Sequence, residues 1–343
     1  MNNLRRVSRT ITTAACALAL VGAASASVSA PSKALPPGSK IVARIPIPQG
    51  GGGFAVGEGA VWAMSSSASR LTRIDPASNA VAARIAVKPA NPCPAFPATC
   101  GEVAAGQGAV WVSVLPDNNV VRVDPATNSV TATIPVGAQP DGVATSPGAV
   151  WVANHGDPSV SGAPSVSRID PATNSVVATI SVGPKSACCN DHMAVTTGAG
   201  AVWVTVPNRG VVVRIDPKSN KVVATIKVSR GSSQPCGFVA VSEAAVWVAG
   251  AHCGGTVTRI DPRTNKPEGT VTGLAAPIGL GLAFGSVWVS DLDAKAIARI
   301  DIRTRRVVGR LPVGGFPVRL SVGLGSVWIR DDTGRVLRIA AQS

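Results

Sequence analysis

The stretch that decides the fold is Gly148-Ala149-Val150-Trp151-Val152, followed by Arg168-Ile169-Asp170-Pro171. The first phrase recurs seven times along the 343 residues, at spacings of 40 to 52 residues, and the second follows each tryptophan after 10 to 17 residues. The tryptophans are Trp62, Trp111, Trp151, Trp203, Trp247, Trp288 and Trp328, and the matching arginines are Arg73, Arg122, Arg168, Arg214, Arg259, Arg299 and Arg338. Seven copies of such a unit predict the seven blades of a β-propeller.

Each unit carries the pattern of a four-stranded sheet. Around Trp151 we expect strands at residues 142–145, 150–153, 165–170 and 175–182, joined by turns rich in Gly, Asn and Pro. The composition agrees, because 36 glycines and 27 prolines interrupt any long helix, and charged residues make up only 15% of the chain. The sequence therefore predicts an all-β protein and argues against a helical bundle or a disordered chain.

The two ends of the repeat array predict how the ring closes. Residues 40–46, Lys-Ile-Val-Ala-Arg-Ile-Pro, match the fourth strand of a unit, such as residues 221–227, yet they precede the first tryptophan. The last unit reaches residue 343 before any fourth strand. We therefore expect strand 40–46 to complete the last blade, so that residues 40–343 form a single propeller domain with no unpaired sheet edge at the seam.

Residues 1–26 have the pattern of a secretory signal peptide. Three arginines precede an uncharged run at residues 14–24, and the small residues of Ala24-Ser25-Ala26 form a cleavage site. Residues 27–39 would then be a proline-containing tether. We expect an exported protein, secreted or held in the periplasm or cell envelope. We expect no transmembrane segment, because no other uncharged run is long enough.

The repeated polar residues are expected to be structural. Asp170-Pro171-Ala172-Thr173-Asn174 and its relatives form a turn between the third and fourth strands, in which Pro fixes φ, Asp accepts backbone hydrogen bonds and Asn tolerates a positive φ. Arg168 and Asp170 lie two residues apart on one strand face, and we expect them to pair within or between blades. The tryptophans are expected to pack between blades.

Loop lengths distinguish the two faces of the ring. The sizeable insertions fall between strands four and one or between strands two and three, and in a propeller both kinds of loop emerge on the same side. We call this side the loop face. The opposite side, the turn face, is expected to carry only uniform tight turns. Because binding residues concentrate on loops, we expect a ligand site on the loop face, over blades one to five.

The cysteines also belong to the loop face. Six remain after removal of the leader, and an even number in an exported chain predicts three disulfides, although six cysteines allow fifteen pairings. Proximity favours one bridge within the first long loop and one within blade five, which leaves a pair of adjacent cysteines. A cross-link from Cys100 to one of that pair is the alternative. The bridges would hold irregular loops, and a redox or metal role stays open. In the favoured pairing the cysteines are Cys93 with Cys100, Cys188 with Cys189, and Cys236 with Cys253.

The candidate binding residues surround the central mouth of the loop face. Neutral imidazole is both a common metal ligand and a proton carrier near pH 7, and all three histidines lie on this face. Glu102 and Arg319 occupy equivalent first-strand positions, nine residues before a tryptophan, and could offer opposite charges to a polar ligand. The ligand-binding candidates are His155, His192, Phe238, His252, Arg209 and Arg319, and the catalytic candidates are His192, His252 and Glu102. A mouth that is simply covered by loops is the alternative.

Charge and spacing limit the partners and cofactors. The net charge is +14, which suits an anionic cell-envelope polymer as a partner. Only 3% of the residues are aromatic and no Lys/Arg run exceeds two residues, which argues against a specific nucleic-acid function. No His-x-His or Glu-x-x-His spacing occurs. No cofactor is therefore predicted, a divalent metal stays open, and a monomer is expected, with the identity of the ligand or protein partner unknown.

The repeat resembles a known family. Pro140-Asp141-Gly142-Val143-Ala144 followed by Val150-Trp151-Val152-Ala153-Asn154 is similar to the YVTN-type, YncE-like repeats of bacterial seven-bladed propellers. Relatives of that family include surface-layer propellers, propeller subunits of quinoprotein dehydrogenases, and virginiamycin B (streptogramin) lyases. The resemblance covers about residues 40–340 and implies the fold, but propellers of this kind bind, scaffold or catalyse.

The lyase relatives imply one specific activity. Their chemistry is an elimination that opens a cyclic depsipeptide ester, with a histidine base and a divalent metal held by acidic residues. This chain has no tyrosine and no Glu-x-His pair, so no motif transfers residue by residue. It also lacks a recognisable ligand set for a quinoprotein cofactor. We therefore expect an exported binding or interaction module. A lyase or another eliminating or hydrolysing enzyme is the alternative, and enzyme activity is left open.

Overall fold

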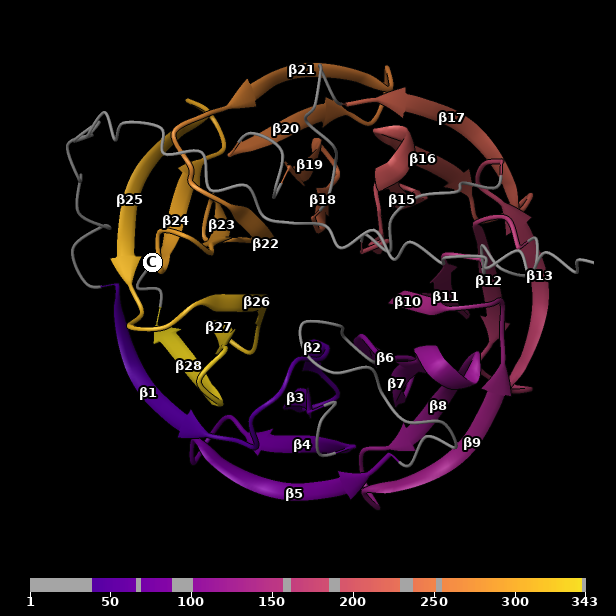
Figure 1. Ribbon diagram of the computed structural model, residues 1–343, viewed down its shortest axis with the longest axis horizontal. Coiled ribbons are helices and arrows are strands. Elements are labelled where there is room, and N and C mark those ends of the chain that lie inside the picture. The colour runs from indigo at the N-terminus through magenta and orange to yellow at the C-terminus, as the bar shows by residue number, and fades with distance from the viewer. Residues whose placement is uncertain are drawn as a thin grey trace, which may run out of the picture. The chain divides into compact units, whose positions relative to one another are not determined.

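The protein forms a ring of seven four-stranded antiparallel sheets (Figure 1). The computed structural model describes residues 39–65, 69–87, 101–156, 162–184, 192–228, 237–250 and 255–340. All of them lie in one compact unit, Lys33–Ser343. The predicted fold class, an all-β seven-bladed β-propeller, is confirmed.

Blades one to six each run from an inner strand to an outer strand in chain order. Blades one to three consist of β2 (Phe54–Gly57), β3 (Ala60–Ser65), β4 (Arg70–Asp75) and β5 (Ala80–Ala86); β6 (Val103–Gly106), β7 (Ala109–Val114), β8 (Asn119–Asp124) and β9 (Ser129–Pro135); and β10 (Pro140–Ser146), β11 (Ala149–Asn154), β12 (Ser165–Asp170) and β13 (Ser175–Ser181). Blades four and five consist of β14 (Val195–Gly198), β15 (Ala201–Val206), β16 (Val211–Asp216) and β17 (Lys221–Lys227); and β18 (Val239–Ser242), β19 (Ala245–Gly250), β20 (Thr256–Asp261) and β21 (Lys266–Val271).

Blade six consists of β22 (Pro277–Ala283), β23 (Ser286–Asp291), β24 (Ala296–Asp301) and β25 (Arg306–Pro312). Blade seven consists of β26 (Pro317–Gly323), β27 (Ser326–Asp331), β28 (Arg335–Ala340) and β1 (Lys40–Pro46). Two short 3-10 helices, η1 (Leu115–Asp117) and η2 (Pro207–Arg209), connect the second and third strands of blades two and four. No helix in the described residues is both long and apolar enough to cross a membrane.

The N-terminal strand closes the ring as predicted. Strand β1 pairs antiparallel with β28, with Lys40 opposite Ala340 and Pro46 opposite Arg335, so the first strand of the chain is the outer strand of the last blade (Figure 1). Ile45 is 3% exposed and packs in the cluster around Trp328. Closure therefore joins the two ends of the repeat array through backbone pairing and apolar burial.

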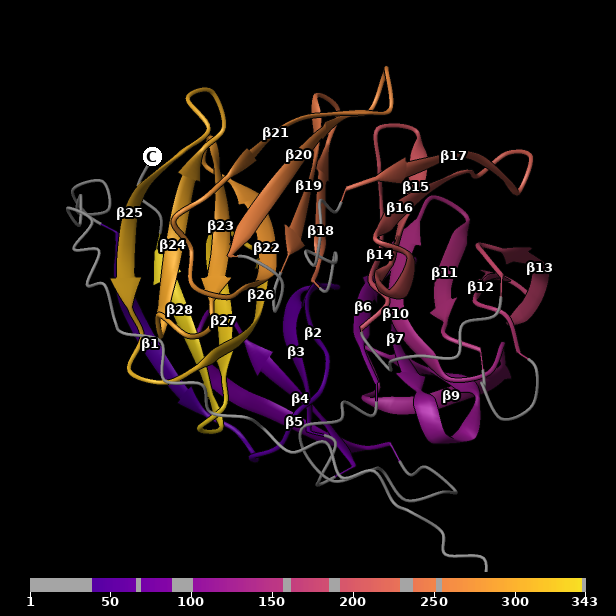
Figure 2. The same ribbon diagram turned by 45° about the horizontal axis from the view of Figure 1, so that its top comes forward.

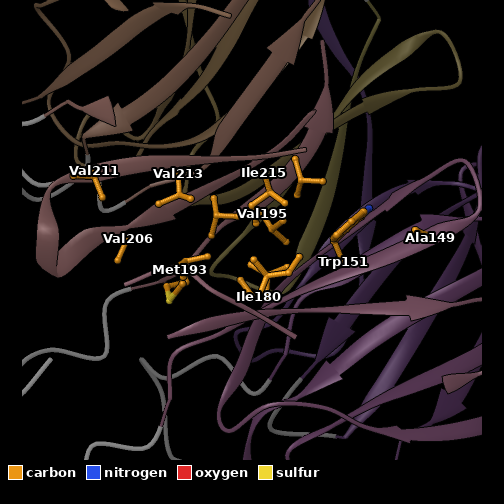
Figure 3. Close-up of a cluster of buried hydrophobic side chains, with 14 residues drawn as sticks. Ala149, Trp151, Ile180, Met193, Val195, Val206, Val211, Val213 and Ile215 are labelled. Carbon is orange, nitrogen blue, oxygen red and sulfur yellow. The ribbon is translucent and has the colours of Figure 1, made fainter. Parts of the chain in front are cut away.

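The core lies between the blades. All seven tryptophans are buried, and Trp151 of blade three packs against Val213 and Ile215 of blade four (Figure 3). The same contact recurs around the ring, because Trp111 of blade two meets Val150 and Val152 of blade three. The prediction that the tryptophans pack between blades is confirmed.

The repeated arginine makes a polar link between blades. The guanidinium of Arg168 lies 5.2 Å from the ring centroid of Trp151. Its Nη1 donates to the carbonyl oxygen of Pro217 at 2.9 Å and to Oδ1 of Asn220 at 2.9 Å, both in the turn of the next blade. Asp170, the expected partner, instead accepts the backbone N–H of Ala172 within its own turn. An arginine side chain is long enough to reach the neighbouring blade, so it pairs with the turn rather than with the aspartate.

Candidate functional site

The inner strands place one residue of each blade at the centre of the ring. Seven positions, each nine residues before a tryptophan, are equivalent in strand register: Gly53, Glu102, Gly142, Ala194, Phe238, Gly279 and Arg319. Four of them are small because the backbones of neighbouring blades approach closely here. A Cβ on Gly53 would lie 2.2 Å from the backbone nitrogen of Val103. The three large side chains therefore occupy the space left at the middle of the ring.

Two of these large residues form an ion pair across blade one. Arg319 donates through Nε at 2.9 Å and through Nη2 at 2.6 Å to Oε1 of Glu102. Both side chains are largely buried, and Nη1 of Arg319 donates to the carbonyl oxygen of Val318. Gly53 stands between them in the ring order, so the absence of a side chain there leaves room for the pair.

A second polar cluster centres on Asp141 at the inner end of blade three. Asp141 is 3% exposed. Its Oδ2 lies 2.9 Å from Nε2 of His155 and accepts the backbone N–H of Met193 at 2.8 Å, while its Oδ1 lies 2.9 Å from Nδ1 of His192. Every hydrogen bond to this carboxylate thus comes from a loop residue or from the start of the next blade.

Burial and charge act in opposite directions in this cluster. Burial raises the pKa of Asp141, but the charge of His192 and the hydrogen bonds from both histidines more than offset this and hold the pKa far below its ordinary value. Burial also lowers the pKa of His192, but the charge and hydrogen bond of Asp141 dominate and raise it. Each group thus favours the charged form of the other, an imidazolium beside a carboxylate.

A cavity of about 150 Å³ lies against both clusters. The His192 and Phe238 rings have centroids 4.4 Å apart, and the guanidinium of Arg319 lies 4.8 Å from the Phe238 centroid on the same ring. Nε2 of His192 is buried and has no hydrogen-bond partner among the described residues. The lining includes Glu102, Val143, His192, Thr196, Phe238 and Arg319. A histidine with one unpartnered ring nitrogen therefore belongs to the lining of this small cavity.

Another cation lies close to the ion pair. Arg330, on the second strand of blade seven, is fully buried and donates to the carbonyl oxygens of Gly50, Gly52 and Met64 in blade one. Burial lowers its pKa to about 10, with the charge of Arg319 acting in the same direction, so it stays charged at neutral pH. The titratable side chains that line the cavity itself are Glu102, His192 and Arg319.

The sequence candidates separate into three groups in the structure. Glu102, His192, Phe238 and Arg319 line the cavity. The second group does not line the cavity. It consists of His155, which contacts Asp141, and Arg209 of η2, which donates to the carbonyl oxygen of Val182. The third group lies outside the described residues and consists of His252 and the six cysteines, Cys93, Cys100, Cys188, Cys189, Cys236 and Cys253.

Asp141 is the residue that sequence reasoning missed. The sequence nevertheless carries a signal for it. The phrase Pro140-Asp141-Gly142 puts a carboxylate one residue before the glycine of the inner ring, directly beside the position of Glu102 in the neighbouring blade. A buried carboxylate needs partners, and the two nearest loops each supply a histidine.

The lyase resemblance implies a divalent metal, and the same residues can be tested for it. Ligand atoms of Glu102, Asp141 and His192 lie within 4.8 Å of one another. Both oxygens of Asp141 already accept hydrogen bonds, and Oε1 of Glu102 accepts two from a guanidinium. A cation would have to compete with Arg319 and with the proton on His192. The donor set suits an ion-pair network and fits a divalent metal poorly.

Fold and site together define a seven-bladed β-propeller with a charged central cavity. No protein-family model and no curated protein sequence matches the chain. Among solved structures, virginiamycin B lyase from Staphylococcus aureus is similar with a TM-score of 0.69 and 15% identity, over 89% of this chain and 100% of that chain. A catalytically inactive variant of that lyase with quinupristin gives a TM-score of 0.65 and 14% identity, over 89% of this chain and 98% of that chain.

A further similar structure has a different activity. Hydrazine synthase from Kuenenia stuttgartiensis gives a TM-score of 0.68 and 15% identity, over 86% of this chain and 96% of that chain. The expected distant similarity to the virginiamycin B lyase is thus confirmed for the fold. At such low identity, neighbours with different activities show the shared propeller architecture alone.

Proposed function

We propose that this chain is an exported binding module whose central cavity, on the loop face, takes the acceptor-bearing end of a small ligand. The observation that carries the proposal is the unpartnered Nε2 of His192. A buried donor without an acceptor is costly, and a ligand carbonyl or carboxylate oxygen would satisfy it. With His192 protonated, two cations and one carboxylate line the cavity, which favours a carboxylate over a cationic group.

The cavity is built to orient such a group. Asp141 fixes the His192 ring through Nδ1, so Nε2 has a defined direction before a ligand arrives. Phe238 packs against that ring and offers apolar surface beside the donor. A volume of about 150 Å³ accommodates a group roughly as large as benzene, so only one end of a larger ligand would enter.

A ligand screen with paired histidine variants tests the proposal. Small carboxylates, esters and amides are screened by thermal shift, and hits are measured by calorimetry. His192→Ala should weaken a hit by about tenfold or more, because a charge-assisted hydrogen bond is lost. His155→Ala is the matched control, since it contacts the same carboxylate without lining the cavity. Equal affinity of the His192→Ala variant and the wild type for every hit would overturn the proposal.

The pH dependence gives a second readout. The pKa of His192 is raised above 6.5 by the charge and hydrogen bond of Asp141, so its imidazolium persists to a higher pH than that of an ordinary histidine. Affinity for a carboxylate hit should therefore be constant below this pKa and fall as pH rises through it. An affinity that is independent of pH between 5 and 9 would argue that His192 does not donate to the ligand.

A second candidate function, elimination by a lyase, is favoured by the Asp141–His192 pair. A histidine that is oriented by a carboxylate and presents its other nitrogen to a cavity is the usual arrangement of a catalytic acid or base. In such an elimination the histidine would take a proton from carbon, a C=C bond would form and the ester C–O bond would break, so that the ring opens without a change in mass. His192 could act as the base only above its raised pKa.

Incubation with quinupristin distinguishes the two functions. Chromatography with tandem mass spectrometry detects an opened ring of unchanged mass, and the new double bond can be followed by absorbance. Ring opening that is lost in His192→Ala and kept in His155→Ala would support the lyase. No ring opening at any pH between 6 and 9 would leave the binding module as the function.

A further inference from the structure

The turn face is less uniform than its sequence pattern suggested. Five arginines reach the Pro carbonyl and the Asn side chain of the next blade, as Arg214 does at Pro262 and Asn265. Blade six departs from this pattern, because Ile302 and Arg305 replace the proline and the asparagine of its turn. The asparagine acceptor that the next arginine in the series, Arg259, would reach is therefore absent from the blade-six turn, and a like charge stands in its place.

Arg259 turns back into its own blade. Its guanidinium forms an ion pair with Glu268 on β21 and donates to the carbonyl oxygen of Ala244 at 2.9 Å. The polar link that the other five arginines make to the next blade is thereby replaced between blades five and six. A groove remains at this junction, with a volume of about 290 Å³.

The groove has an apolar lining that reaches the surface. Two of the lining residues from blade six are exposed, Phe284 at 43% and Ile302 at 45%. Leu282 and Trp247 form deeper parts of the lining, and Arg259 lies at one edge. The equivalent of Phe284 in blade one is Glu58, whose side chain instead accepts a backbone N–H of the next blade. An exposed aromatic side chain has thus replaced a polar contact beside an open apolar groove.

Positive charge gathers around the same groove. The six residues that begin at the turn aspartate contain no Lys or Arg in blades one to three. The same windows in blades four to six contain seven exposed cations, and the hairpins that carry them can be followed in Figure 2. They are Lys218, Lys221, Arg263, Lys266, Arg303, Arg305 and Arg306. The groove is therefore next to a basic band on one half of the turn face.

We propose that this groove docks an acidic polypeptide segment of a partner, with one apolar side chain inserted between blades five and six and carboxylates on the basic band. The apolar lining needs a side chain to cover it, and the band needs opposite charge. A sugar-phosphate or polyphosphate chain offers charge without an apolar group. A membrane surface is flat and would not fill a recess between two blades. A polypeptide can place an apolar side chain in the groove and carboxylates, a few residues away, on the basic band.

Designed peptides and a turn-restoring variant test the docking site. The probe is a fluorescein-labelled peptide of alternating Asp and Glu with one central Phe, and its partner probe has Ser in place of Phe. The variant Ile302→Pro with Arg305→Asn recreates the turn sequence of the other blades and restores the asparagine acceptor, so Arg259 should turn to the blade-six turn and fill the groove. The control Arg303→Asn removes one charge from the same turn and leaves the groove open.

Fluorescence anisotropy at low and moderate salt gives the outcome. The Phe peptide should bind wild type at least about tenfold more tightly than the Ser peptide, because an inserted ring is buried. The affinity for the Phe peptide should fall about tenfold in the double variant, and no more than about threefold in Arg303→Asn. Circular dichroism should show that the double variant is folded with an unchanged or higher melting temperature.

Three results would overturn the proposal. Equal binding of the Phe and Ser peptides, or equal binding of polyphosphate, would mean that charge alone attracts anions to the band. Wild-type affinity in the double variant would mean that the groove is not used. Binding only to vesicles that contain phosphatidylglycerol would assign this face to a membrane surface.

Discussion

Replacement of Asp141 by asparagine removes one charge from the centre of the site and keeps the shape of the side chain. The carboxylate is almost completely buried and serves three donors, two histidines and the backbone N–H of Met193. An asparagine keeps one acceptor oxygen but replaces the other with an NH₂ group. At least one donor therefore loses its partner, and the imidazolium of His192 loses the charge that stabilises it.

The expected cost follows from the loss of a buried ion pair. Removing one partner of such a pair costs about 3–5 kcal/mol, and the remaining acceptor oxygen places this variant near the lower end, at about 3 kcal/mol. A domain of about 300 residues has an unfolding entropy near 0.6 kcal/mol/K at its melting temperature. The melting temperature should therefore fall by about 5 °C near pH 6.

The pH dependence of that difference is the sharper readout. His192 has a raised pKa in the folded protein, so its contribution to stability is fully present below pH 6.5 and is lost as pH rises through the raised value. Asp141 has a lowered pKa, so its contribution is present above pH 3.8 and is lost as pH falls below that. The difference in melting temperature between wild type and Asp141→Asn should be largest between pH 3.8 and the raised pKa of His192, and smaller at pH 9.

Thermal unfolding followed by circular dichroism from pH 3 to pH 9 measures both effects. The reasoning would be refuted by a melting temperature within about 1 °C of wild type at pH 6, which is below the shift expected for a lost buried pair. It would also be refuted by a gap that stays constant from pH 5 to pH 9. Either result would mean that the cluster is not an ion pair in solution.

The remaining predictions concern a contrasting carboxyl group, the seam and the cysteines. Burial raises the pKa of Asp291, and its Oδ2 lacks a hydrogen-bond partner among the described residues, so Asp291→Asn should leave the melting temperature at pH 7 unchanged or higher. The raised pKa means that ionisation of Asp291 costs stability only as pH rises above 3.8. Any increase in melting temperature caused by Asp291→Asn should therefore disappear near pH 3. Deletion of residues 39–48 strips the outer strand from blade seven, removes the buried Ile45 and uncovers Val336 of β28 opposite it, so unfolding in urea should show a loss of about 3 kcal/mol or more; an unchanged midpoint would contradict the closure. Mass mapping of a non-reduced digest should join Cys93 to Cys100 and Cys236 to Cys253, whereas a thiol count near six would exclude these bridges.

The fold was predictable because each blade repeats the same physical solution. Trp151 and Arg168 each contact the next blade, so their recurrence in every unit reports the inter-blade packing directly. The partner of Arg168 was harder to predict. Residues two apart on a strand share a face, which suggested the aspartate, but sequence spacing does not show how far a long side chain reaches. The interaction that forms spans 52 residues, from Arg168 to Asn220.

The site was less predictable, because its contacts join different blades through non-repeated loops. Equivalent register placed Glu102 and Arg319 at the same depth, and the structure shows that they form a pair although 217 residues separate them. The link from His192 to Asp141 spans 51 residues and depends on the path of the inter-blade loop. No local spacing encodes that path, so a single sequence indicates the histidine but not the carboxylate that orients it.

The departures from the repeat are the most informative positions for function. A closed ring requires the tryptophan and glycine positions to repeat, since each solves the same packing problem in each blade. Nothing in that packing requires a glutamate, a phenylalanine or an arginine at the inner ring, where glycine or alanine serves four blades. The packing of the ring likewise does not require Ile302 and Arg305, which stand where other blades have the proline and asparagine of the inter-blade link. Restoring the repeat at either place should therefore preserve folding while removing binding, and the two faces can be tested separately.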